Sequence, residues 1–480
     1  MFKLTPVAAA VLVMVAGHAM AANSLSSQYQ QGSGNTADVQ QVNAAYASVQ
    51  QVQIGDGNDT AAYQTQTNSQ IDQRQEGNQN GAYGEQLYET DSKITQRQND
   101  QRNSTQASQS LGTGNQTTTR QSGNGNFAFA YQENQLGSII NIEQSGSNNQ
   151  AWSEQLSGGA GNNAQVFQNG DRNQASTEQV EHFNGQIQLN QNGNDNYIYS
   201  DQRYGNGGSI TAEQNGNFNT GQLFQDTQTD SHVSLTQTGT FNEGVLDQIQ
   251  GTLNNINMVQ WGDRNAASVT QYNVTNSTSN VYQNGQDNLH FSSQAGTGHN
   301  LTSSATGSGN KVQASEREGA RLGGQFGIGQ TAFLNQNGND NVINMTQKGV
   351  GNLTNLKQDG NRNDAKTTQD DNYNELYFEQ NGSDNILIAD QRGEGNYAQG
   401  SSFGNGNSTD LTQSGSDNQS FTSQNGNGNE IVVKQADSYN VAYVSQSGNL
   451  NQANVNQSAT NQAASITQVG NSNQATVHQQ

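Results

Sequence analysis

The stretch QNGNGNEIVVKQ, from Gln424 to Gln435, holds the pattern on which nearly the whole chain is built. It begins and ends on glutamine, and the two glutamines are 11 residues apart. Alternate residues of a β-strand point to the same side, so Ile431, Val433 and Gln435 share one face. The Asn- and Gly-rich segment before them favours a tight turn, because Gly and Asn tolerate positive φ. The stretch therefore predicts a turn followed by a strand with one buried face.

Glutamine recurs at this phase along the chain. Steps of 11 back from Gln479 reach glutamine at every position as far as Gln325, with one exception. Nearer the N-terminus the step becomes 11 or 12, and the phase continues to Gln30, so that 38 of 41 positions are glutamine. The exceptions are Ala305, Glu316 and Ser402. A sustained repeat of this kind predicts an all-β solenoid of strand-turn-strand rungs, with 22 or 23 residues to each of about twenty rungs.

Composition taken alone is typical of disorder, because Ile, Leu, Val and Phe are sparse and the net charge is −22. The sustained repeat contradicts that interpretation. With 18 Lys and Arg against 40 Asp and Glu, nucleic acid and anionic membranes are disfavoured as partners. The chain has no cysteine for disulfides, and its only proline is Pro6, so strand pairing can continue without interruption.

The N-terminus has the features of a secretory signal peptide. Lys3 precedes a short apolar stretch, Val7 to Ala16, and the small-residue site Ala19-Met20-Ala21 follows. The apolar stretch is too short to span a bilayer, and we expect no membrane insertion elsewhere. We predict a signal at 1–21, a repeat array with 11- or 12-residue units at 22–316, an irregular joint at 317–324, and a stricter 11-residue array at 325–480.

Charge avoids one face of the predicted strands. Among the residues four and two places before each repeat glutamine, only Arg321 is charged and only His290 is a histidine. This face is therefore expected to be buried. Stacked in register, the recurring glutamine and asparagine amides could bond to the rungs above and below, forming a ladder that satisfies buried polar groups. The alternative is that these amides only face solvent.

The pattern Gln-x-Gly-x-x-Asn-x-Ala-x-x-x-Gln, repeated behind a secretory signal, resembles the curlin repeat over nearly all of the mature chain. The resemblance implies a secreted subunit of extracellular curli-like amyloid fibres on the bacterial cell surface, which support adhesion and the biofilm matrix. It also implies self-association, with a nucleator subunit and a dedicated secretion pore with its chaperones as further partners. The ladder residues taken over are Gln336, Gly338, Asn341, Gln347, Gln424, Gly426, Asn429, Gln435, Gln446, Gly448, Asn451, Gln457, Gln468, Gly470, Asn473 and Gln479.

Two departures from the family accompany this resemblance. The chain has many more repeats than familiar curlins, and repeat Gln30 begins almost directly after the signal, where familiar curlins carry a Gly-rich leader.

Two other functions compete with the fibre subunit. A monomeric secreted β-solenoid could act as an adhesin or bind polysaccharide, but it would need a flat stripe of one outward residue type, which the sequence lacks. An enzyme would need acids and bases on neighbouring rungs. The candidate aspartates instead favour solvated turns, and the six histidines have no metal-ligand spacing, so we expect no catalytic site, metal or cofactor. These aspartates are Asp195, Asp287, Asp340, Asp384 and Asp417.

Overall fold

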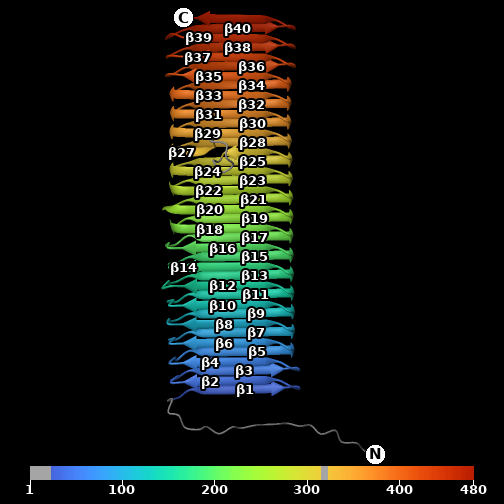
Figure 1. Cartoon of the computed structure of the whole chain (residues 1–480), viewed down its shortest axis with the longest axis vertical. Coiled ribbons are helices and arrows are strands. Elements are labelled where there is room, and N and C mark those ends of the chain that lie inside the picture. Colours follow the sequence, from blue (N-terminus) through green and yellow to red (C-terminus); the bar gives the residue numbers. More distant parts are fainter. Residues whose placement is uncertain (1–22, 315–322) are drawn as a thin grey trace, which may run out of the picture.

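The computed structural model describes residues 23–314 and 323–480. Within them every regular element is a β-strand, and the chain winds into a flattened coil whose rungs stack along one axis (Figure 1). The predicted all-β solenoid is therefore confirmed. The predicted signal peptide at 1–21 lies outside the described residues, as does most of the predicted joint at 317–324. No helix in the described parts is long and apolar enough to cross a membrane.

One long parallel sheet contains 20 strands, one from each rung. These strands are β1 (Leu25–Gln31), β3 (Ser48–Ile54), β5 (Gln70–Asn78), β7 (Lys93–Gln101), β9 (Gln116–Asn124), β11 (Ile139–Ser147), β13 (Asn163–Asp171), β15 (Gln186–Asn194), β17 (Ser209–Asn217), β19 (His232–Thr240), β21 (Asn255–Asp263), β23 (Thr278–Gln286), β25 (Asn300–Ser308), β28 (Thr331–Asn339), β30 (Leu353–Asn361), β32 (Glu375–Ser383), β34 (Tyr397–Asn405), β36 (Gln419–Asn425), β38 (Val441–Ser447) and β40 (Ala463–Val469). We call this sheet A.

The second parallel sheet, sheet B, holds the other half of each rung. Its strands are β2 (Thr36–Val42), β4 (Asp59–Thr65), β6 (Gly81–Leu87), β8 (Ser104–Ser110), β10 (Phe127–Glu133), β12 (Gln150–Leu156), β14 (Gln174–Val180), β16 (Tyr197–Arg203), β18 (Thr220–Thr229), β20 (Glu243–Thr252), β22 (Ala266–Thr275), β24 (Leu289–Thr297), β26 (Lys311–Ala314), β27 (Gly324–Ile328), β29 (Val342–Val350), β31 (Asp364–Asn372), β33 (Ile386–Glu394), β35 (Ser408–Ser414), β37 (Glu430–Gln435), β39 (Gln452–Gln457) and β41 (Gln474–Gln479).

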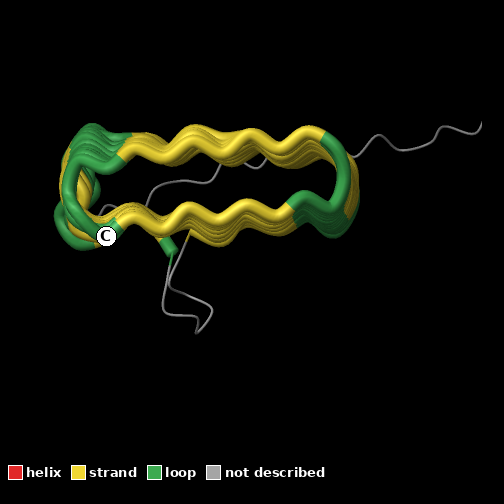
Figure 2. Tube along the Cα trace, turned by 90° about the horizontal axis from the view of Figure 1, so that it is seen from above, coloured by secondary structure: helices red, strands yellow, loops and turns green. Residues whose placement is uncertain are grey.

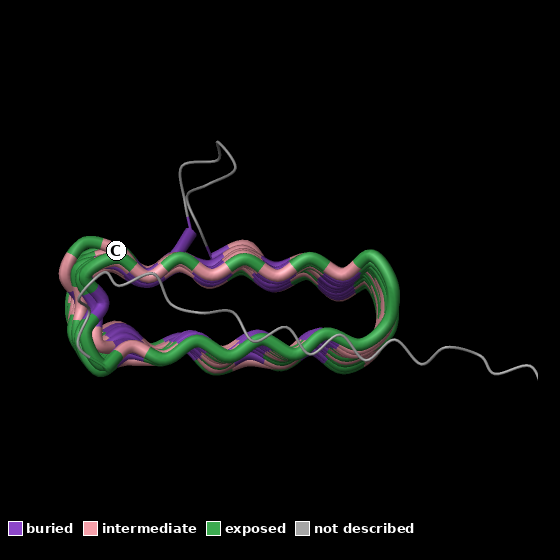
Figure 3. The backbone as a smooth tube through the Cα atoms, turned by 90° about the horizontal axis from the view of Figure 1, so that it is seen from below, coloured by how far each residue is buried: buried purple, intermediate pink, exposed green. Residues whose placement is uncertain are grey.

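In cross-section the two sheets lie face to face and are joined by a turn at each edge (Figure 2). Side chains alternate between the interior and solvent, so the buried residues line the inside of the loop (Figure 3). The apolar core is thin and falls into three clusters of buried residues in the described chain. Polar layers separate the clusters, one containing the buried Thr105–Thr119 hydrogen bond of 2.7 Å and the other the buried His290.

The pairing around the predicted joint corrects one expectation. β24 pairs with β26 through His290 and Val312, and it pairs with β27 through Gln294 and Gln325. β26 and β27 therefore share one level of sheet B, and the chain between them is an insertion within that level. The predicted ladder position Glu316 lies outside the described residues, and Gln325 pairs with Gln294 at this level. The rungs on both sides belong to one continuous stack.

One spacing also differs from expectation. The interval from Gln155 to Gln168 is 13 residues, not 11 or 12. The additional length lies in the turn between β12 and β13, where Ser157 and Gly158 have positive φ. The flanking strands keep their register, with Gln144 beside Gln168. Turns can absorb an added residue because their side chains do not have to alternate between core and solvent.

Candidate functional site

The repeat glutamines form a hydrogen-bonded column inside each sheet, which in sheet A is interrupted at Ala305. In sheet B, Gln413 Nε2 donates to Gln435 Oε1 and Gln435 Nε2 donates to Gln457 Oε1, each at 2.9 Å. In sheet A, Gln424 donates to Gln446 at 3.2 Å, and Gln446 donates on to the next rung at 2.8 Å. Parallel pairing places equivalent side chains directly above one another, so the amides line up head to tail.

Many of the glutamine amides also link the two sheets. Gln435 Nε2 donates to the backbone oxygen of Gln419 in sheet A at 3.0 Å, and Gln424 Nε2 donates to the backbone oxygen of Ser408 at 2.9 Å. Both amides are buried, with Gln424 at 0% and Gln435 at 1% exposure. The column therefore holds the sheets together where the apolar core is thin, and its inner amides do not face solvent.

The column has a direction. Where consecutive rungs both carry the repeat glutamine, Nε2 of one rung donates to Oε1 of the following rung, as from Gln336 to Gln358 at 3.0 Å and from Gln347 to Gln369 at 2.9 Å. In the last rung, Gln468 Nε2 donates to a backbone oxygen of β39, and the half-exposed Gln479 Nε2 donates to a backbone oxygen of β40. Every rung thus presents amide donors on one side and amide acceptors on the other.

Asparagine forms a second column at the turn that follows each strand of sheet A. Asn429 N–H donates to Asn407 Oδ1 of the preceding rung at 3.0 Å, and its Nδ2 donates to Gly448 O of the next rung at 2.9 Å. Asn451 repeats these contacts, with its Nδ2 at 2.8 Å from Gly470 O. One side chain therefore fixes the turn to the rungs above and below. Asn341 and Asn473 occupy the same column, and Asn473 lies in the last rung.

The glycines of the same turn allow the rungs to approach closely. Gly426 has φ +134° and Gly448 has φ +119°, which is the region that favours glycine. A Cβ on Gly426 would overlap the carbonyl of Gly448, and a Cβ on Gly448 would overlap that of Gly470. Gly338 lies in the same way against Gly360. Glycine is needed here both for its φ and for the backbone contact.

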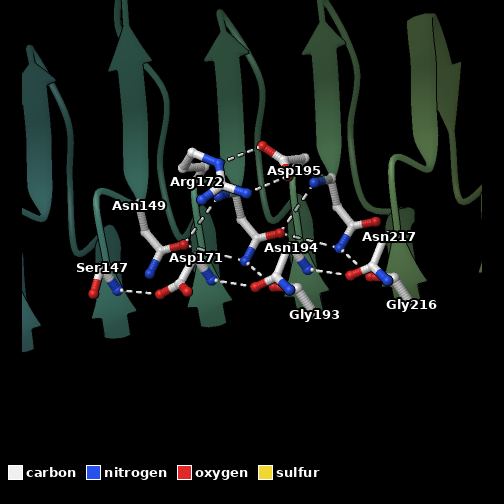
Figure 4. A network of polar contacts seen from close by, with 11 residues as sticks. Ser147, Asn149, Asp171, Arg172, Gly193, Asn194, Asp195, Gly216 and Asn217 are labelled. Atoms are coloured by element: carbon white, nitrogen blue, oxygen red, sulfur yellow. Dashed lines mark hydrogen bonds and ion pairs between the residues drawn. The ribbon is translucent and has the colours of Figure 1, made fainter.

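Where the strands of sheet A end, backbone N–H groups of one rung donate to side-chain oxygens of the next rung (Figure 4). The N–H of Ser147 donates to Asp171 Oδ1, and the N–H of Asp171 donates to Asn194 Oδ1, both at 2.9 Å. Beside them, Arg172 Nη2 lies 2.7 Å from Asp195 Oδ2 of the next rung. The hydrogen bond from Arg172 lowers the pKa of Asp195, but both groups are solvated and contribute little to stability.

Two of the other four turn aspartates considered as catalytic candidates show a related arrangement. Asp287 pairs with Arg264 and Asp384 pairs with Arg362, both at 2.8 Å and both one rung apart. In the described residues no group of three or more His, Cys, Asp or Glu side chains is arranged to hold a metal ion. Asp195, Asp287 and Asp384 are thus each paired with an arginine of the preceding rung.

A further amide column was not anticipated. Gln28, Gln51, Gln73 and Gln96 lie two residues before repeat glutamines of sheet A, where small or apolar residues were expected. They form their own ladder with amide contacts of 2.8 to 2.9 Å. The signal that would have revealed it is the spacing of these four residues, which is 22 or 23. The first rungs thus contain more buried amides than the later ones.

Some of the turns that follow strands of sheet B carry buried titratable groups. Burial raises the pKa of Glu89, whose carboxylate accepts a hydrogen bond from Ser92 at 2.6 Å. His182 occupies the equivalent place four rungs later, and burial lowers its pKa to about 4. Its Nδ1 is buried without a hydrogen-bond partner, because the residue equivalent to Ser92 is Gly185.

Comparison with known families supports the repeat assignment. The family model for the curlin associated repeat matches residues 404–436, which span β35, β36 and β37 together with their turns. The match includes Gln424, Gly426, Asn429 and Gln435, whose contacts are described above. A comparison with curated proteins returns no significant match to this chain. The repeat match and the solenoid fold are consistent with a curlin-repeat protein and suggest a structural role.

Proposed function

We propose that this chain is a secreted structural subunit that stacks end to end into extracellular curli-like amyloid fibres, which serve cell adhesion and the biofilm matrix. The observation that carries the proposal is the direction of the amide columns. Each rung offers donors to the following rung and acceptors to the preceding one. The last rung of one molecule therefore matches the first rung of another in both its backbone and its side chains.

The register inside the stack predicts the contacts at such a joint. β1 and β40 belong to sheet A, and β2 and β41 belong to sheet B. Continuing both columns places Gln468 Nε2 against Gln30 Oε1, and Gln479 Nε2 against the equivalent glutamine of β2. The asparagine column continues when the N–H of Asn35 donates to Asn473 Oδ1. All of these contacts have the geometry of an internal rung.

The terminal rungs supply edges for this joint. Every residue of β1 is exposed, and β41 alternates between exposed and half-buried residues. Open strand edges recruit further strands. A joint between two different surfaces does not close on itself, so it extends into a filament rather than a ring. The outward charges oppose nonspecific sideways clumping, since the net charge is −22, and leave only matched side contacts between copies favourable.

The direct test follows assembly of the purified mature chain after dilution from denaturant. We expect sigmoidal growth of thioflavin fluorescence, and fibre diffraction at about 4.7 and 10 Å. A monomer that stays soluble at high concentration would contradict the proposal. It would favour the alternative of a monomeric β-solenoid that acts as an adhesin or binds polysaccharide.

A more specific test removes a backbone hydrogen-bond donor from the open edge of β41. Gln452, an outward residue of β39, and Ser458, just after β39, donate their backbone N–H groups to the next rung at 2.8 and 3.0 Å. By the same alternation, the N–H of Thr476 in β41 points away from β39 towards the open edge. Thr476→Pro removes this donor and leaves the pairing between β39 and β41 intact, because an edge strand tolerates proline on its free side.

We expect small amounts of Thr476→Pro to stop growth of wild-type fibres at one end. The variant keeps its own first rung, so it can add to a fibre, but it then offers a blocked last rung. Thr476→Ala is the matched control, since it keeps the N–H group and should support growth. Equal growth with both variants would show that the last rung does not form the joint.

The proposed location and partners rest on the curlin resemblance. A self-assembling subunit of this kind would be exported to the bacterial cell surface, with a nucleator subunit and a dedicated secretion pore with its chaperones as further partners. Detection of the chain in fibres sheared from intact cells would test the location.

A further inference from the structure

Three arginines form a row on the outer face of sheet A. Arg74, Arg97 and Arg120 are each the fifth residue of their strands, β5, β7 and β9. They pair in register on consecutive rungs, Arg74 beside Arg97 and Arg97 beside Arg120. Their side chains are 49%, 53% and 50% exposed. This arginine row lies near the middle of the face and is reachable from solvent, in a chain whose net charge is −22.

Three acids form a matching row on the outer face of sheet B. Glu154, Glu178 and Asp201 are each the fifth residue of their strands, β12, β14 and β16. They also pair in register on consecutive rungs. Their side chains are half-buried or buried, so this acidic row is recessed relative to the arginine row.

Within one molecule the ion pairs differ in length along both rows. Like charges directly opposite one another on neighbouring strands are destabilising. The nearest carboxylate to Arg97, in the middle of its row, is that of Asp72 at 3.9 Å, whereas Arg74 and Arg120 have closer acidic partners. Arg97 is therefore the member of its row with the weakest internal ion pair.

The acidic row shows the same imbalance. Arg203 contacts Glu178 at 3.0 Å and Asp201 at 2.7 Å, while Glu154 has no ion pair among the described residues. Burial, together with the charge of Glu178, raises the pKa of Glu154, and burial raises the pKa of Asp201 to about 6. These carboxylates would gain from a cation placed on their open side.

We propose that two copies of this chain associate side by side, with the arginine row of one copy facing the acidic row of the other. The contact goes beyond the proposed fibre and does not depend on it, although it would repeat along one. The argument is charge complementarity at a matched spacing. Successive members of both rows are separated by one strand spacing, about 4.8 Å, so three arginines can meet three acids in step.

The placement of the rows favours copies that run in the same direction. Sheets A and B form opposite faces of the solenoid (Figure 2), so a sideways shift brings sheet A of one copy against sheet B of the next. Arg97 lies in β7 and Glu178 in β14, which is three rungs further along the stack. The facing copies are therefore offset along the axis by about 14 Å. Since the two surfaces differ, the contact can repeat and bundle more than two copies.

A polyanion is the competing occupant of the arginine row. The acidic excess of the chain opposes the approach of a long polyanion along either face. A second copy carries the same acidic excess, but it presents three acids to the three arginines at the spacing of the strands. The second copy is therefore the better match, and the polyanion becomes one outcome of the test.

The test compares fibres of the full mature chain at about 0.01 M and about 1 M salt, where exposed charges are weakly and strongly screened. Fibre width is measured by electron microscopy, and end-to-end growth is followed separately by thioflavin fluorescence. We expect paired and bundled fibres at low salt and single fibres at high salt. Arg97→Glu should lower the bundled fraction at low salt by roughly tenfold without slowing growth. Arg102→Glu, which makes the same charge change at an exposed turn residue, should leave bundling unchanged.

A second experiment reverses the charge on both faces. Arg97→Glu combined with Glu178→Arg restores complementarity and should recover the bundles. Unchanged bundling in Arg97→Glu, or loss of bundling without recovery in the double variant, would overturn the proposal. Single wild-type fibres that bind heparin and lose it in Arg97→Glu would also overturn it, in favour of a polyanion site.

Failure of the fibre and failure of the side contact are distinguishable. If the chain remains monomeric under fibre-forming conditions, sedimentation equilibrium at low salt still tests the side contact. Dimers that dissociate in high salt and are absent in Arg97→Glu would support it. Monomers of wild-type protein at low salt would reject it.

Discussion

The side chain of Gln336 lies directly above Ala305, and its Oε1 is buried without a hydrogen-bond partner. In every intact column this oxygen accepts from the glutamine one rung before it, and Ala305 has no donor to offer. Ser402, the other described exception among the repeat glutamines, does not leave such a gap. Its Oγ donates to Gln424 Oε1 at 2.8 Å. A hydroxyl can therefore replace the glutamine amide as donor to the following rung, and a methyl group cannot.

Ala305→Gln should stabilise the stack. The new amide would donate to Gln336 Oε1 and satisfy a buried acceptor, whose lack of a partner costs about 1 to 3 kcal/mol. We expect the free energy of unfolding to rise by about 1 to 2 kcal/mol, measured by urea denaturation of the monomer. Ala305→Met is the control, because it fills a similar volume without a donor. Equal stabilisation by Met and Gln would mean that filled space, not the hydrogen bond, produces the gain.

Gly404→Ala should be strongly destabilising. Gly404 has φ +112°, and an added Cβ would overlap the carbonyl of Gly426 in the next rung. Both the strained φ and the clash raise the energy of the turn, so we expect a loss of about 2 kcal/mol or more in urea unfolding. Gly406→Asn is the matched control two residues later. Gly406 has φ +64° with nothing within 4 Å of an added Cβ, and Asn accepts this φ readily.

His182 should make the fold sensitive to acid. Burial lowers its pKa from 6.5 to about 4, so the folded state favours the neutral imidazole. The penalty is absent above pH 6.5 and grows as the pH falls towards 4, where it reaches about 3 kcal/mol. Stability is thus lost on acidification. His182→Gln should flatten the urea unfolding free energy over this pH window, whereas His232→Gln, at an exposed site, should not. Equal pH dependence in wild type and His182→Gln would contradict this assignment.

Glu89 should make the stability of the fold depend on pH in the opposite direction. Burial raises its pKa from 4.5, so the folded state favours the neutral acid and stability is lost as the pH rises above 4.5. Gln135 occupies the equivalent turn position two rungs later and accepts from Ser138 at 3.2 Å, so an amide fits this site. Glu89→Gln should raise stability at pH 7 by about 1 to 2 kcal/mol and have little effect near pH 4. Glu213→Gln, which neutralises an exposed acid, is the control.

Much of the fold can be predicted from the sequence because strand and turn leave local signatures. The alternation around Ile431 and Val433 identifies a buried face, and Gly426 and Asn429 identify the turn before it. The column of Gln28, Gln51, Gln73 and Gln96 shows where this reasoning ends. Glutamine at a core-facing position has no apolar signal, and its role follows only when equivalent residues of successive rungs are superposed.

The break in the glutamine phase before Gln325 shows a second limit. A break in phase does not distinguish a joint between two arrays from an insertion in one level. The pairing of Gln294 with Gln325 establishes the latter for the described strands on both sides. Local sequence contains no information on which strand lies opposite which.

The sequence by itself determined the strands, the turns, the buried face and the positions of the repeat amides, because each follows from the backbone conformation and the side-chain alternation of a single 11-residue unit. Only the tertiary structure decided the direction of the amide columns, the missing donor at Ala305, and the faces that carry Arg97 and Glu178. These features depend on which residues of different rungs lie in contact. Contact between rungs depends on the winding of the solenoid. Each full turn places residues about 22 positions apart in the sequence on neighbouring strands.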